Sequence, residues 1–67
     1  MVANKYIRGA IDYLVDRVGA VYDWKLTEKS LVYYEYGFEG CKGKRVVIPL
    51  SEVERYYYEV SKERWGA

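Results

Sequence analysis

Apolar side chains recur at helical spacing through the first 18 residues, and charged side chains lie on the opposite side of the same predicted helix. The apolar positions are Val2, Tyr6, Ile7, Ala10, Ile11, Leu14, Val15 and Val18. Gly19 follows and is a suitable residue to end a helix in the left-handed conformation. The pattern therefore predicts an amphipathic helix over residues 2–18, with Asp12 and Asp16 on its charged, solvent-facing side.

After Gly19 the period changes from helical to alternating, which is typical of half-buried strands. Residues 20–26 place Tyr22, Trp24 and Leu26 on one face. Residues 31–38 alternate again, and one face would carry Val32, Tyr34, Tyr36 and Phe38. The polar segment 27–30 between them has the length of a hairpin turn. A second turn, rich in glycine, follows at residues 39–44.

A third strand runs directly into a second helix. Val46, Ile48 and Leu50 share one face of this strand, and Pro49 has no N–H to continue the ladder. Ser51 is predicted to be the N-cap of the helix, with Glu54 completing a capping box. The apolar face of this helix carries Val53, Tyr56, Tyr57 and Val60.

These elements predict one small α+β domain over residues 1–67, in the order α-β-β-β-α. The three strands would form an antiparallel sheet, and both helices would pack on its single apolar face. The other face would be open to water and partly polar. We expect that open face to show Val21, Asp23, Lys25, Tyr33, Glu35, Arg45 and Val47.

Two segments resemble the winged-helix DNA-binding domain of the MerR and excisionase type. Residues 27–38, with Tyr-Tyr-Glu before a glycine, look like its recognition-helix segment, and residues 43–56 look like the second strand of its wing and the following helix. The resemblance implies an alternative fold, a winged helix-turn-helix. It also implies contacts with double-stranded DNA. The residues that it assigns to the major groove are Lys29, Ser30, Val32 and Tyr33, and those that it assigns to phosphate are Lys42, Lys44 and Arg45.

The chain departs from that family in two places. Ten residues with a strand-like pattern lie between Gly19 and Ser30, where the family has a short turn, and Val32 stands where the family usually carries arginine. We therefore predict a strand over residues 31–38. The order of elements also resembles a double-stranded RNA-binding domain, but that family has lysines at the start of its second helix. Here Glu52 and Glu54 would repel phosphate, which argues against RNA.

The residue types exclude most catalytic and metal chemistry. The chain has one cysteine, Cys41, and no histidine, so an internal disulfide, a Cys/His zinc site and a Cys/His or Ser/His nucleophile are all excluded. The glycines match no phosphate-binding loop. We predict a protein that is not an enzyme, with no cofactor and no small-molecule substrate. The sequence has no membrane-spanning segment, and the simplest expectation is a cytoplasmic protein with a reduced thiol.

The positive charge is concentrated in the middle of the chain. Net charge is only +1, but the positive excess lies around the turn at residues 40–45. We predict a DNA-binding module in transcription regulation that contacts phosphate through this turn. Its predicted nucleic-acid contacts are Lys29, Lys42, Lys44, Arg45 and Tyr33.

The alternative is a protein-interaction module, homodimeric or acting as an adaptor or inhibitor, that binds no nucleic acid. Nine tyrosines and two tryptophans exceed what one small core can bury, and such residues are enriched at interfaces. The predicted partner surface is Tyr58 with Trp65, or the open sheet face around Val47. In either case we expect a homodimer, because 67 residues without disulfide or metal bury little core.

Overall fold

The structure is a computed structural model that describes residues 3–66 of the chain. The predicted α+β fold, with the order α-β-β-β-α and a three-stranded antiparallel sheet, is confirmed. Its elements are α1 (Asn4–Tyr13), η1 (Leu14–Val18), β1 (Asp23–Leu26), β2 (Ser30–Tyr36), η2 (Phe38–Gly40), β3 (Lys42–Pro49), α2 (Leu50–Tyr56), η3 (Tyr57–Ser61) and α3 (Lys62–Arg64). Val2, the first residue of the predicted helix, lies outside the described residues.

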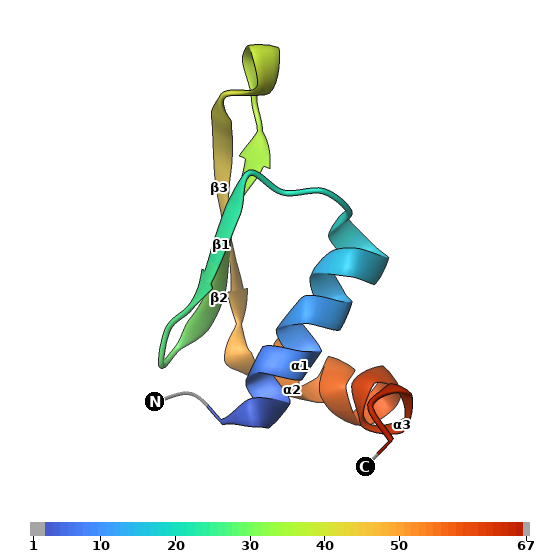
Figure 1. Cartoon of the computed structure of the whole chain (residues 1–67). Coiled ribbons are helices and arrows are strands. Elements are labelled where there is room, and N and C mark those ends of the chain that lie inside the picture. Colours follow the sequence, from blue (N-terminus) through green and yellow to red (C-terminus); the bar gives the residue numbers. More distant parts are fainter. Residues whose placement is uncertain (1–2, 67) are drawn as a thin grey trace.

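Both helical segments lie on the same side of the sheet, as predicted, and the other side of the sheet is uncovered (Figure 1). The strand order is β1-β2-β3, so β2 is central. The hairpin of β2 and β3 continues well past β1 and carries η2 at its tip (Figure 1). The molecule is therefore elongated, with principal extents of 39 × 22 × 16 Å.

The turn between β1 and β2 decides which face of β2 is buried. The Thr27 N–H donates to the Ser30 carbonyl at 2.8 Å, and the Thr27 hydroxyl accepts the N–H groups of Lys29 and Ser30 at 3.2 and 3.0 Å. Leu26 therefore pairs with Leu31. Directly paired residues of antiparallel strands point to the same face, so Leu31 follows Leu26 toward the helices.

The predicted face of β2 was wrong. Leu31 and Tyr33 are 0% and 7% exposed and belong to the core cluster with Ala10, Leu14 and Val53. A shift of one residue moves every side chain of a strand to the opposite face. The predicted faces are correct for Trp24 and Leu26 on β1 and for Val46 and Ile48 on β3, which pair with Tyr33 and Leu31. Val21 was predicted to lie on the open face and instead packs against the core cluster, because β1 begins only at Asp23.

The two helical segments cross in close contact at Gly9. A Cβ at this position would lie 2.7 Å from the carbonyl oxygen of Val53 and 3.2 Å from the Cβ of Tyr57. Ala10 and Ser61 are each fully buried, so the residues at this contact are small. The absence of a side chain at Gly9 therefore sets how closely the helices pack.

β3 passes into α2 with no intervening loop. Pro49 is the last residue of the strand, and the Leu50 N–H bonds to the Lys29 carbonyl at 3.2 Å. The predicted capping box was wrong, because α2 begins at Leu50, with Pro49 at the N-cap position and no side-chain cap. Ser51 is thus already inside the first turn, and Glu54 instead forms an ion pair with Lys5.

Both helical segments contain wider turns than the sequence predicts, at the end of the first segment and before α3 in the second. η1 and η3 are π-helical, and the Gly19 N–H reaches the Leu14 carbonyl, five residues earlier, at 2.6 Å. Gly19 has φ = +92°, a conformation that favours glycine, and the predicted end of the first helix is confirmed.

Candidate nucleic-acid interface

A bulge in β3 brings two cations to the uncovered face of the sheet. Tyr34 pairs with Arg45 and Tyr36 pairs with Lys42. Two steps along β2 therefore correspond to three steps along β3, which carries one extra residue. Lys42 and Arg45 are three residues apart and would point to opposite faces of a regular strand. The bulge places both on the side of Tyr34, and the Lys42 ammonium lies 4.0 Å from the centre of the Tyr34 ring.

The uncovered face around these cations is basic and partly apolar. The pairing register also gives it Lys25 and Val47, which are exposed. Val32 lies among them and is only 2% exposed, although it faces away from the helices. Asp23 is the one acidic residue that the register places on this face within the described strands. Three cations against one carboxylate can attract an anionic ligand.

The tip of the projecting hairpin carries an aromatic ring that is almost fully exposed. Phe38 is 85% exposed and Tyr36 is 56% exposed. Tyr36 is supported by Tyr22, whose ring packs edge-on at 6.0 Å between centroids. Cys41, beside the tip, is an exposed free thiol.

The predicted nucleic-acid residues are only partly brought together. Lys42 and Arg45 share the uncovered face, whereas Lys44 lies inside the bulge between them and has no paired residue on β2. Lys29 lies in the turn at the opposite end of β2.

Tyr33 was predicted to be an exposed contact and is instead buried in the core. Burial raises the pKa of its hydroxyl, and Glu35 and Tyr13 raise it further. Residues 30–36 form β2, so the predicted strand is confirmed and the recognition helix that the winged-helix resemblance implies is absent from the described chain.

The predicted partner residues lie on different sides of the molecule. Val47 is 47% exposed on the uncovered sheet face, whereas Tyr58 and Trp65 are on the helical segments and are 53% and 44% exposed. Trp65 is already engaged within the chain, because its indole N–H donates to Asp12 at 2.8 Å and Arg8 lies 5.3 Å from its ring centre. These three residues therefore do not form one surface.

Sequence reasoning missed a polar cluster between the helical segments. Asp12 was predicted to be solvent-facing and is only 5% exposed. Arg64 bonds to Asp12 at 3.2 Å and to Asp16 at 3.0 Å, and the Tyr56 hydroxyl also donates to Asp16. Asp12 and Arg64 are separated by 52 residues, and the helical period of residues 2–18 carries no signal for such a pairing.

The pKa values of this cluster follow from its hydrogen bonds. Burial by itself would raise the pKa of Asp12, but hydrogen bonds from Ser61 and Trp65 oppose it. With the hydrogen bond and the charge of Arg64 added, the pKa of Asp12 lies below its ordinary value of 3.8. The hydrogen bond to Asp16, followed by burial, raises the pKa of Tyr56. The cluster is a fully partnered structural contact.

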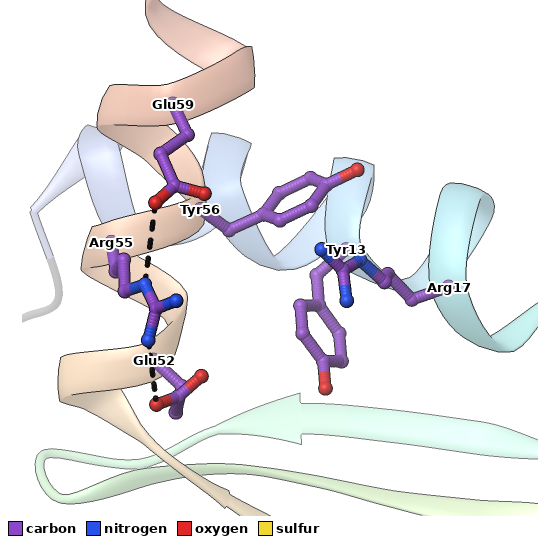
Figure 2. A pocket seen from close by; sticks show the side chains of 6 residues that line it. All are labelled: Tyr13, Arg17, Glu52, Arg55, Tyr56 and Glu59. Carbon is purple, nitrogen blue, oxygen red and sulfur yellow. Dashed lines mark hydrogen bonds and ion pairs between the residues drawn. The ribbon is translucent and has the colours of Figure 1, made fainter.

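A shallow pocket of about 70 Å³ beside this cluster is lined by charged side chains of both signs (Figure 2). Arg55 lies between Glu52 and Glu59, at 3.7 and 3.3 Å from their carboxylate oxygens. Across the pocket, the rings of Tyr13 and Tyr56 meet edge to face at 5.5 Å. Both carboxylates of the pocket are thus engaged by Arg55, and Arg17 lies over the Tyr56 ring, 5.5 Å from its centre.

Among residues 3–66, no group of three or more His, Cys, Asp or Glu side chains is placed to hold a metal ion. Within the same residues, none of the helices combines the length and apolar character needed to cross a bilayer. No protein-family model, no curated protein and no solved structure matches the chain. The uncovered basic sheet face and the projecting hairpin are therefore the features from which a function can be argued.

Proposed function

We propose that the protein is a small DNA-binding module, with a regulatory role, that contacts phosphate through the uncovered face of its sheet. The observation that carries the proposal is the bulge in β3, which puts Lys42 and Arg45 side by side on a face that also holds Lys25. Phosphate contacts by Lys and Arg supply most of the sequence-independent affinity for DNA. The hairpin extends this face away from the helices, so a ligand as wide as a duplex meets no obstruction from them (Figure 1).

Fluorescence anisotropy with a labelled mixed-sequence duplex tests the proposal. We expect binding at low salt that weakens as salt rises, because binding releases condensed counterions. The double variant Lys42→Ala/Arg45→Ala should weaken binding and reduce the slope of log K against log salt by about two, roughly one for each lost phosphate contact. No binding to duplex at low salt would refute the proposal.

The matched control is Lys29→Ala/Lys62→Ala, which removes the same net charge from positions away from the uncovered face. Lys29 is in the turn at the far end of β2, and Lys62 is on α3. If the uncovered face is the binding site, the control variant should retain most of the wild-type affinity for DNA and most of the slope of log K against log salt. Equal losses in both double variants would indicate a diffuse charge effect and no defined face.

The second candidate function is self-association through an apolar groove. The groove lies between the end of the first helical segment and β1, and it has a volume of about 280 Å³. Ile11, Leu14, Val15, Gly19, Val21 and Trp24 line it, and Val15 is 67% exposed. Sedimentation equilibrium tests this candidate: a dimer should dissociate in Val15→Asp and persist in Tyr58→Ala. A wild-type monomer at high micromolar concentration would exclude it.

A further inference from the structure

Phe38 is the most exposed of the large hydrophobic side chains in the described chain, and a defined turn holds it there. Glu39 and Gly40 have φ values of +55° and +77°, and these two residues reverse the chain in a tight turn. The Cys41 N–H donates to the Phe38 carbonyl at 3.1 Å, and the Gly37 N–H donates to the Cys41 carbonyl at 2.6 Å. The ring is therefore presented by a hydrogen-bonded tip.

The hairpin is thinnest directly behind Phe38. A Cβ at Gly37 would lie 3.0 Å from the Cα of Gly43, and one at Gly43 would lie 2.9 Å from the nitrogen of Gly37. The two strands thus meet backbone to backbone at Gly37 and Gly43, where neither residue places a side chain between them. A narrow ribbon that ends in an aromatic ring has the shape of a wedge.

Three cations of β3 lie behind the wedge. Lys42 and Arg45 are on the uncovered face, and Lys44 lies between them along the strand and is exposed. Glu35 lies behind the ring on β2, and Glu39 follows Phe38 at the tip. Behind the ring the ribbon thus carries three cations and one carboxylate, a net positive charge where flanking phosphates would lie.

We propose that Phe38 inserts between adjacent base pairs of duplex DNA and kinks the duplex, while the cations behind it hold the flanking phosphates. This inference rests on the proposed function and adds the mode of binding. Apolar wedges such as Phe can unstack a base step and bend DNA, and the energy of unstacking is offset by the contacts that the bend permits. Here the bent duplex would reach the basic sheet face behind the hairpin.

The test combines two readouts on a duplex with a flexible TA step. Energy transfer between dyes at the two ends reports bending, and 2-aminopurine beside the step reports unstacking. We expect wild-type protein to bend the duplex by about 20° or more and to raise the 2-aminopurine signal. Phe38→Ala should abolish both signals and weaken binding at least about fivefold, whereas Phe38→Trp should retain them.

The possible failures are distinguishable. If the wild type binds duplex in a salt-dependent manner without bending or unstacking it, the wedge is refuted while the proposed function stands. If the wild type does not bind duplex at all, both are refuted. Because Phe38 is exposed, circular dichroism should show that Phe38→Ala is fully folded. Glu39→Gln should bind DNA more tightly than the wild type, because it removes a negative charge beside the ring. Binding of anionic vesicles that is lost in Phe38→Ala, with no effect on DNA shape, would assign the tip to a lipid surface and overturn the inference.

Discussion

The contact at Gly9 gives a quantitative test of how the helical segments pack. In the Gly9→Ala variant, the new Cβ would lie 2.7 Å from the Val53 carbonyl oxygen. Ordinary carbon–oxygen contacts begin near 3.3 Å, so the helices must separate by about 0.6 Å. The carbonyl is backbone and cannot rotate away. The cost should therefore be near the upper end of the range for overpacking, about 3 kcal/mol.

Helix propensity opposes this cost, because alanine is favoured over glycine in a helix by about 1 kcal/mol. The net loss of unfolding free energy should therefore be about 2 kcal/mol, which corresponds to a fall in Tm of roughly 10 °C for a domain of this size. Urea and thermal melts followed by circular dichroism measure both. The control is Asn4→Ala at an exposed position of α1, which should change stability by less than about 0.5 kcal/mol. A Gly9→Ala protein as stable as the wild type, or more stable, would show that the helices do not cross in contact here.

Three further changes test other parts of the fold. Ser51→Ala should alter the unfolding free energy by less than about 0.5 kcal/mol, because Ser51 does not cap α2. A loss of about 1 kcal/mol or more in urea melts would show that Ser51 does cap the helix. Asp12→Asn should be less stable than the wild type by about 1–2 kcal/mol at pH 7. Since the pKa of folded Asp12 lies below 3.8, the contribution of its carboxylate to stability is complete above pH 3.8 and is lost as pH falls through the folded pKa. The melting temperatures of the wild type and Asp12→Asn should therefore converge in acid. A difference that stays constant with pH would contradict this assignment. Gly43→Ala should speed amide exchange at Gly37, because the added Cβ would lie 2.8 Å from the Glu35 carbonyl and force the hairpin strands apart; unchanged exchange would contradict the close contact.

Local patterns in the sequence predict the elements of this fold well. The helical period of residues 2–18, the glycine at its end and the alternation on either side of residues 27–30 each report a property of one segment. Each of these elements is present, although β1 and β2 are shorter than predicted, β3 begins inside the predicted second turn, and each helical segment contains a π-helical turn. The connection without a loop between β3 and α2 follows from a strand that ends at Pro49.

The buried face of β2 could have been predicted, but alternation alone was insufficient. Leu31 and Val32 are both apolar, so either face of β2 is acceptable when the strand is considered by itself. The four-residue turn removes the ambiguity by pairing Leu26 with Leu31. By contrast, Asp12 is buried because Arg64 and Trp65 come from the far end of the chain to meet it. No periodicity within the first helix contains that information.

The candidate site depends on a backbone feature that composition does not reveal. Lys42 and Arg45 were selected from the sequence as charges in a turn, but both lie in β3, where regular alternation would separate them. They share a face because the strand carries one extra residue between them. Gly43 also lies between them, and a Cβ there would be only 2.8 Å from the Glu35 carbonyl oxygen of the opposite strand. A side chain at Gly43 would disturb the pairing that holds this bulge. The basic face therefore depends as much on the missing side chain at Gly43 as on the two cations themselves.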